Sequence, residues 1–135
     1  MLQELTFKEI ALHRKSKCPV IHLQDKANNI LPIYVGEDQA RSIIEATKLR
    51  DRPVTRPHTH DLFANFLTSW SMELEKVVIN SITEKDVYIA SLIVKLGDTT
   101  KEIDCRPSDA IALAIRVNCP IFAESALITS SSVAA

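Results

Sequence analysis

The alternation of apolar and polar positions predicts three strands in the first 35 residues. In residues 4–14 the apolar positions alternate but change phase once, which is the pattern of a strand that contains a β-bulge. Apolar runs follow at residues 18–23 and 30–35, and residues 25–29 between them have the composition of a turn. Pro32 offers no N–H to a strand ladder, so its strand fits an edge or a bulge better than a central place. We therefore expect an antiparallel meander of three strands.

Helical periodicity predicts two helices after Gly36. In the first helix, buried positions recur at i, i+3, i+4 and i+7, and they are Ala40, Ile43, Ile44 and Thr47. Residues 50–58 contain two prolines and should form an irregular loop. The second helix begins near Thr59 or His60, with Thr59 as its N-cap and Asp61 in the first turn, where a carboxylate favours the helix dipole. The predicted apolar face of this helix consists of Leu62, Phe63, Phe66, Leu67 and Trp70.

Strand patterns return in the second half of the chain. Residues 73–82 and 86–95 are joined by a polar turn and form a predicted hairpin. The second of these strands is apolar on both faces, so we expect it to be covered on both. Residues 101–105 and 121–123 add two short strands. Between them, residues 110–115 are apolar all round, which predicts a helix that is buried on most sides.

These elements together predict the fold class. Pro107 fits the first turn of the third helix, where its missing N–H would be unpaired in any case. The order of elements predicts an α+β fold, a mostly antiparallel twisted sheet with about three helices packed on it. A length of 135 residues suits one domain. We place this domain at residues 1–128 and expect a flexible tail at residues 129–135.

Composition narrows the classes of function. Apolar residues make up 46% of the chain, and a net charge of −1 gives no overall basic field of the kind that marks a nucleic-acid binder. The cysteines are scattered singly, which argues against a disulfide framework or a zinc site. The chain has two glycines, Gly36 and Gly97, whereas a phosphate-cradling loop or a dinucleotide fingerprint needs several in one turn. We expect a cytoplasmic protein without a membrane partner, because neither a signal-peptide pattern nor an apolar stretch of roughly 18 residues is present.

Polar groups gather at the starts of two predicted helices, in residues 56–62 and 104–114. Each segment has an Arg-Pro step, then a Ser or Thr, then an Asp at the start of an apolar run. One interpretation is structural. Carboxylates at a helix start interact with unpaired N–H groups and with the helix dipole, and Arg106 then pairs with one of the nearby aspartates. On this interpretation the charges are caps, and the chain is a non-enzymatic module that self-associates or binds a partner.

The other interpretation is chemical and requires the two segments to meet in space. Asp61, Asp104 and Asp109 would then offer carboxylate oxygens to a hard divalent ion such as Mg²⁺ or Mn²⁺. His60 would transfer protons near neutral pH. Arg106 would stabilise negative charge on a phosphate. Such a set of groups suits the hydrolysis of phosphodiester bonds.

A local basic patch precedes the second helix and contains Arg50, Arg52 and Arg56. These side chains are candidate contacts for the phosphates of a nucleic-acid substrate, and the alternative is a solvated loop. His58 lies two residues before His60, so the two rings would face the same way in an extended segment. This spacing allows either a paired-histidine metal or substrate site, or an exposed loop histidine.

Four motifs, in this order, resemble the bifunctional nuclease (BFN) domain family: LPIYVG, RPHTHDL, IDCRPSDAIALAIR and CPIF. The resemblance covers roughly residues 5–128 and implies an α+β domain that is widespread in bacteria. It also implies the nuclease label, which comes from plant relatives that act on both RNA and DNA, but it supplies no mechanism. A homo-oligomer, with a dimer favoured, fits the resemblance. The family commonly has a glutamate where this chain has Gln39, so one charge is missing if that acid belongs to a site.

Two hypotheses follow. The first is a phosphodiesterase that acts on DNA, RNA or both, with a divalent ion as its candidate cofactor. Its candidate polar centre consists of His60, Asp61, Asp104, Arg106 and Asp109. The second is the non-enzymatic oligomeric or partner-binding module, in which the same groups are structural caps. The geometry of the carboxylates separates the two, because only the first needs them to converge on an open cleft.

Overall fold

The computed structural model describes residues 1–48 and 56–131, and this part of the chain forms one seven-stranded sheet with four helices. The strands are β1 (Leu2–Leu12), β2 (Pro19–Gln24), β3 (Ile30–Tyr34), β4 (Glu73–Ile82), β5 (Tyr88–Leu96), β6 (Thr99–Cys105) and β7 (Ile121–Glu124). The helices are α1 (Glu37–Lys48), α2 (Thr59–Ser69), α3 (Pro107–Val117) and α4 (Ser125–Ser131). The strand order is β3-β2-β1-β7-β4-β5-β6, and β4–β7 is the parallel pair in an otherwise antiparallel sheet. The predicted α+β class is confirmed.

The amino-terminal meander is also confirmed. β1 pairs with β2 and β2 pairs with β3, both antiparallel. The register of β1 on β2 shifts between Phe7 and Glu9, which is the bulge that the change of phase predicted. Pro32 lies in β3, an edge strand of the sheet, where one side needs no ladder bonds.

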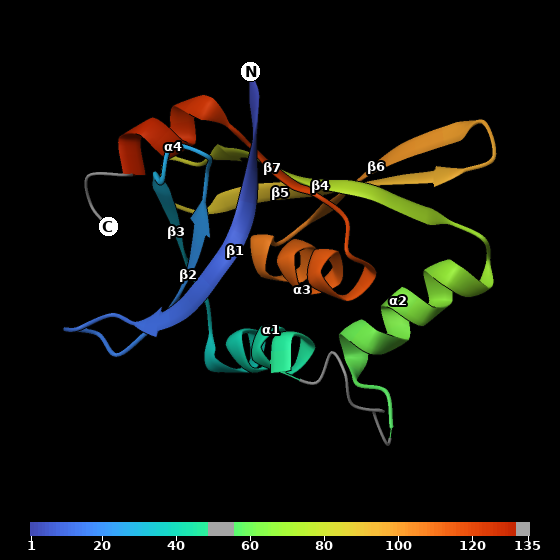
Figure 1. Cartoon of the computed structure of the whole chain (residues 1–135), viewed down its shortest axis with the longest axis horizontal. Helices are drawn as coiled ribbons and strands as arrows, with labels where there is room; N and C mark the ends of the chain where they lie inside the picture. The colour runs from blue at the N-terminus through green and yellow to red at the C-terminus, as the bar shows by residue number, and fades with distance from the viewer. Residues whose placement is uncertain (49–55, 132–135) are drawn as a thin grey trace.

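The helix α3 is the centre of the fold. It packs on β4 and β5, and α1 and α2 pack against it (Figure 1). The residues from Ala110 to Ala114 are at most 2% exposed, as their apolar sequence predicted. Alanine at three of these five positions lets the helix approach its neighbours closely. Because α3 contacts both α1 and α2, its first turn lies near α1 and the start of α2.

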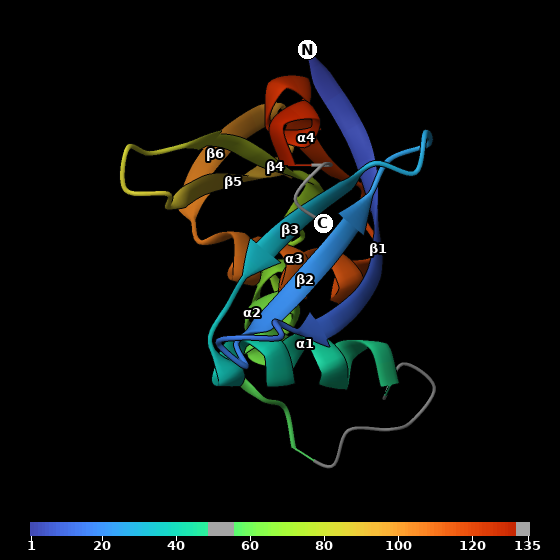
Figure 2. The same ribbon diagram turned by 90° about the vertical axis from the view of Figure 1, so that its left-hand side faces the viewer.

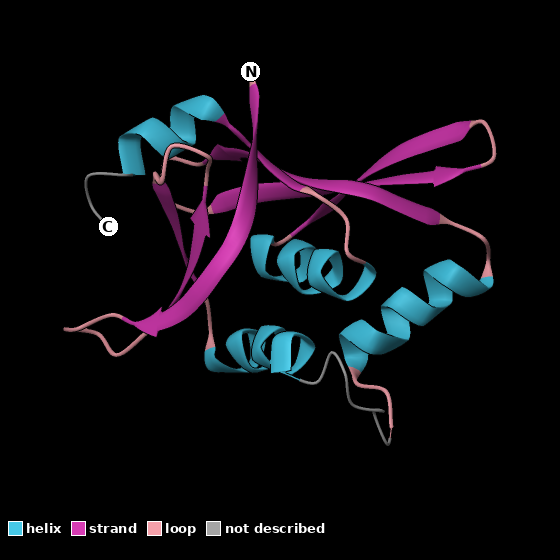
Figure 3. Ribbon diagram, in the orientation of Figure 1, coloured by secondary structure: helices cyan, strands magenta, loops and turns pink. Residues whose placement is uncertain are grey.

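The predicted apolar face of α2 is wrong, because only Leu67 is buried. Leu62, Phe66 and Trp70 are 61%, 55% and 64% exposed, and Phe63 is 41% exposed. The helix lies at the side of the molecule and packs on α3 and β4, which cover a narrow strip of its surface (Figure 3). Periodicity identifies an apolar stripe but not the element that covers it.

The short helix α4 was not predicted. It follows β7 directly and packs against β3 and β7, with Leu127 and Ile128 buried (Figure 2). It extends to Ser131, into the segment expected to be a flexible tail, and residues 132–135 lie outside the described part of the chain. Among the described helices, none combines the length and the apolar character that a membrane crossing requires.

The three cysteines are free and partly buried. Burial raises the pKa of Cys105 to about 12, with the nearby carboxylates of Asp109 and Asp104 adding to the effect. Burial likewise raises the pKa of Cys119 to about 11. Both groups are therefore protonated thiols at neutral pH, in keeping with a packing role rather than a nucleophilic one.

Candidate active site

An open depression of about 990 Å³ lies where α1, the start of α2 and the start of α3 meet. The two polar segments singled out in the sequence thus come together at its wall. Its polar lining includes Ser42, Glu45, His58, His60, Arg106 and Asp109. These side chains reach one place because α3 packs against both α1 and α2.

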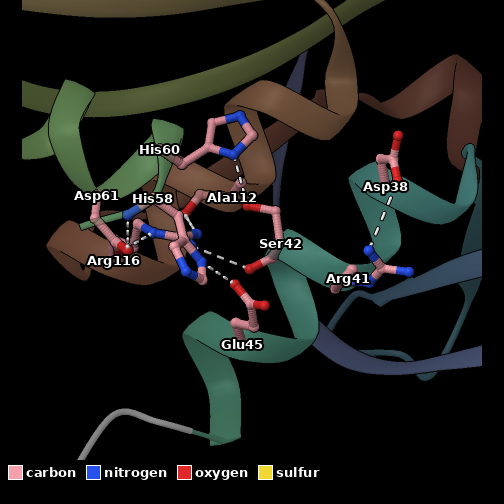
Figure 4. Close-up of polar contacts among 9 residues, drawn as sticks. All are labelled: Asp38, Arg41, Ser42, Glu45, His58, His60, Asp61, Ala112 and Arg116. Atoms are coloured by element: carbon pink, nitrogen blue, oxygen red, sulfur yellow. Dashed lines mark hydrogen bonds and ion pairs between the residues drawn. The ribbon is translucent and has the colours of Figure 1, made fainter. Parts of the chain in front are cut away.

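His60 stands between a hydroxyl and a carboxylate. Its Nε2 atom is 2.9 Å from Oδ1 of Asp109, and its Nδ1 atom is 2.6 Å from Oγ of Ser42. Figure 4 shows the Ser42–His60 bond between α1 and the start of α2. An ionised carboxylate only accepts hydrogen bonds, so the network assigns the ring proton to Nε2. Nδ1 is then the acceptor, and the Ser42 hydroxyl donates to it.

Asp109 is held in its ionised form. Arg106 donates from Nε to Oδ2 at 2.8 Å and from Nη2 to Oδ1 at 2.9 Å, a two-point contact across one turn of α3. Burial acts to raise the pKa of Asp109, but the hydrogen bonds from Arg106 and His60 outweigh it and lower that pKa below its ordinary value. The Arg106 side chain itself is 63% exposed, so its remaining surface faces the depression and solvent.

Asp61 belongs to a second, more buried unit. Its Oδ1 atom accepts a 2.7 Å hydrogen bond from Nε of Arg116, whose side chain is 7% exposed. Arg116 also donates to the backbone carbonyls of Ala112 and Ser42 (Figure 4). Burial acts to raise the pKa of Asp61, but the bonds from the His58 backbone and Arg116 dominate and lower it. Through Arg116, which bonds both to Asp61 and to the carbonyl of Ser42, this unit ties α1, α2 and α3 together.

The start of α2 differs in one detail from the prediction. His58, not Thr59, occupies the N-cap position, and the backbone N–H of His58 donates to Oδ2 of Asp61 at 3.0 Å. The ring of His58 turns toward Glu45, with Nδ1 and Oε2 2.6 Å apart. The two histidines therefore have different partners. Within residues 1–48 and 56–131, no group of three His, Cys, Asp or Glu side chains is arranged to hold a metal ion.

Asp104 does not join this centre. It is exposed on β6, in register with Ser91 of β5, and it is not among the residues that line the depression. Arg106 pairs with Asp109, which settles the alternative left open by the sequence. Arg56 is exposed just before α2, and Arg50 and Arg52 lie outside the described residues.

Gln39 has a structural role at the start of α1. Its side-chain oxygen accepts a 2.8 Å hydrogen bond from the backbone N–H of Gly36. This is the reciprocal contact that a Gln or Glu at the third helical position makes with the residue before the helix. An amide oxygen serves here as well as a carboxylate would, so the absent charge leaves the helix start intact.

Three residues of the arrangement were not predicted: Ser42, Glu45 and Arg116. Arg116 carried a signal, because a charge directly after a fully apolar helical run needs a buried partner. Ser42 and Glu45 carried none, since their partners lie 18 and 13 residues away along the chain. Only the packing of α1 against α3 brings them to the depression.

Comparison with known proteins agrees with the motifs. The family model described as "Bifunctional nuclease domain" matches residues 20–135. An uncharacterised protein of Mycobacterium tuberculosis is 31% identical over 123 residues, which are 90% of this chain and 71% of that protein. "Bifunctional nuclease 2" of rice, Oryza sativa subsp. japonica, is 31% identical over 117 residues, 84% of this chain but 35% of the rice protein. "Bifunctional nuclease 1" of the same plant is 27% identical over 104 residues, 76% of this chain and 31% of the relative.

The match by the family model extends over most of the chain, and the mycobacterial relative is covered over more than two thirds of its own length. The rice proteins are about three times as long as the part they share with this chain. On the first two findings, this chain belongs to the bifunctional nuclease domain family.

Proposed function

We propose that this protein hydrolyses phosphodiester bonds of DNA or RNA in the depression, with His60 transferring protons and Arg106 contacting the phosphate. The observation that carries the proposal is the position of His60, between the carboxylate of Asp109 and a hydroxyl, at the wall of an open depression. The names of the rice relatives support nucleic acid as the class of substrate.

The chemistry follows from the protonation states. With its proton on Nε2, His60 accepts a proton at Nδ1 from the attacking oxygen. The imidazolium that forms is stabilised by the ionised Asp109, whose lowered pKa keeps the negative charge in place. Arg106 is fixed on Asp109 at two atoms and is otherwise exposed, so its charge is available to a phosphate oxygen.

Two of the carboxylates that line the depression have arginine partners, Asp38 with Arg41 and Asp109 with Arg106. These two pairs reduce the repulsion that an anionic substrate would meet. We further propose that the basic patch of Arg50, Arg52 and Arg56 attracts the nucleic-acid backbone by charge.

The test is an assay of purified protein on single-stranded DNA, RNA and duplex DNA, each with Mg²⁺, Mn²⁺ or EDTA. His60→Ala should lower kcat/KM by about 100-fold or more, because a positioned proton-transfer group contributes on that order. His22→Ala is the matched control, since His22 bonds to Glu9 on β1 and does not line the depression. Cleavage at the wild-type rate by a folded His60→Ala variant would refute the proposal, and equal cleavage by every variant would indicate a contaminant.

The exposed face of α2 favours a second candidate function, self-association. Leu62, Phe63, Phe66 and Trp70 form an apolar surface on one helix. Contiguous apolar surface of this kind is often an interaction site in soluble proteins. We propose that two copies of the chain bury this face against each other, which is compatible with catalysis at the depression.

A further inference from the structure

We propose that Ser42 is the nucleophile of this site and that hydrolysis passes through a covalent phosphodiester on its hydroxyl oxygen. This inference rests on the phosphodiesterase function proposed above and identifies the oxygen that attacks phosphorus. It gives α1 a catalytic residue that no motif of the sequence predicted.

The geometry is that of an activated hydroxyl. Oγ of Ser42 lies 2.6 Å from Nδ1 of His60, and Nε2 of the same ring lies 2.9 Å from Asp109. A hydroxyl, an imidazole and a carboxylate in series activate serine in hydrolases of unrelated folds. In the usual triad, Nε2 accepts from the serine and Nδ1 donates to the carboxylate. Here Nδ1 accepts from the serine and Nε2 donates to the carboxylate. The exchange leaves the chemistry intact, because either nitrogen serves as acceptor when the other carries the proton.

Three other hydroxyls, within α1 and α2, make a different contact from that of Ser42. Thr47, Thr68 and Ser69 each donate to a backbone carbonyl of the preceding turn, at 2.8, 3.1 and 2.7 Å. That bond is the ordinary one for a hydroxyl inside a helix. Ser42 instead directs its hydroxyl to His60 and lines the depression. Its carbonyl accepts a 3.2 Å bond from Arg116, which fixes this part of α1.

The first step transfers the nucleotidyl group to serine. Oγ of Ser42 attacks phosphorus as its proton passes to Nδ1 of His60. The bond from phosphorus to the leaving oxygen breaks on the side opposite Oγ. That oxygen takes a proton from solvent, so the first product leaves as an alcohol while Nδ1 keeps the proton from Ser42. Arg106 offsets the negative charge that develops on the phosphate oxygens.

The second step restores the enzyme. A water molecule attacks phosphorus from the side opposite Oγ and gives a proton to solvent. The bond between Oγ and phosphorus breaks, and Oγ takes its proton back from Nδ1 of His60. The net reaction is the addition of one water across the phosphodiester bond, without an oxidant, a reductant or a further co-reactant.

The experiment uses the intact protein and diisopropyl fluorophosphate, which phosphorylates activated serines with loss of fluoride. Intact-mass and peptide mass spectrometry should find a single adduct on Ser42. His60→Gln should slow its formation about 100-fold or more. In the nuclease assay, Ser42→Ala should lower kcat/KM by about 100-fold or more, because nucleophile and base act as a unit. Ser69→Ala is the matched control, an exposed helical serine outside the depression. Circular dichroism checks that each variant is folded.

The outcomes separate this inference from the function on which it rests. Wild-type cleavage that is undiminished in Ser42→Ala would overturn the nucleophile and leave the phosphodiesterase standing. An adduct on Ser42 without cleavage of any nucleic acid would keep the nucleophile and overturn the substrate class. Loss of cleavage in Ser42→Ala with no adduct on Ser42 would make the serine a positioning residue of His60, and the covalent step would be wrong.

Discussion

A largely buried ion pair links the three helices around the depression. Arg116 lies at the end of α3 with a side chain that is 7% exposed, and it bonds to Asp61 on α2 and to a carbonyl of α1. An isolated charge in such a place is costly, so each partner depends on the other. The contact therefore holds the three helices together in addition to pairing two opposite charges.

Arg116→Met should lower the free energy of unfolding by about 3 kcal/mol, because it leaves the carboxylate of Asp61 partly buried without its cation. Urea denaturation followed by circular dichroism measures the change. Arg41→Met is the control, since Arg41 and Asp38 are exposed and 3.9 Å apart, and its effect should stay within about 0.5 kcal/mol. Equal effects of the two substitutions would contradict the structural role of Arg116.

The sequence predicted those residues of the site that have local signatures. His60, Asp61, Arg106 and Asp109 stand out because they belong to Arg-Pro steps at helix starts or follow them closely, and the structure brings them to one region. Asp104 belongs to the same polar segment of the sequence but lies on β6. The strand ends at Cys105 and α3 begins at Pro107, so the chain leaves the sheet within two residues. Their partners on α1 have no local signature, since the register of one helix on another is not encoded in either segment alone.

At the scale of elements, α2 is a helix with a largely uncovered surface. Leu67 is its buried residue, while its larger aromatic side chains are exposed. The strands were easier to predict, because alternation, the bulge and the edge proline are properties of the strand itself. What covers an element is a property of the whole packing, which explains why the face of α2 was assigned wrongly to the core.

The double substitution Phe66→Ser with Trp70→Ser should shift the protein to a smaller assembly, because it removes two exposed aromatic side chains from the proposed contact. Size-exclusion chromatography with light scattering measures the mass over a range of concentrations. Leu12→Ser is the control, since Leu12 is 65% exposed at the end of β1, away from α2. A mass that is the same for wild type and double variant at every concentration would rule out this face as the interface.

At the scale of the whole molecule, three aspartates link folding to pH. Burial acts to raise the pKa values of Asp25, Asp61 and Asp109, but hydrogen bonds outweigh burial and lower all three below the ordinary 3.8. Asp25 closes the turn between β2 and β3 by accepting from the backbone of Ala27 and Asn29. The β2–β3 turn, the contact between α2 and α3, and the wall of the depression therefore each contain a carboxylate that folding stabilises in its ionised form.

Because these pKa values are lowered on folding, their stabilisation is complete above the ordinary value and is lost as the pH falls through the folded values. The free energy of unfolding should therefore drop when the pH is lowered from roughly 5 to roughly 3. Urea titrations at a series of pH values measure this. Asp109→Asn should make the dependence shallower, whereas Asp98→Asn, at an exposed turn, should leave it unchanged. An unfolding free energy that is constant over the whole range would contradict the linkage.

The position of β7 has a consequence for the way the protein is made. This strand of four residues, Ile121–Glu124, lies between β1 and β4, so it joins the amino-terminal meander to β4, β5 and β6. Among the seven described strands, it is the last to leave the ribosome. Until then the nascent chain carries two open strand edges that no earlier segment fills, and such edges attract other chains or chaperones. The interval between the synthesis of β4 and that of β7 is the period in which the growing polypeptide is most exposed to mispairing.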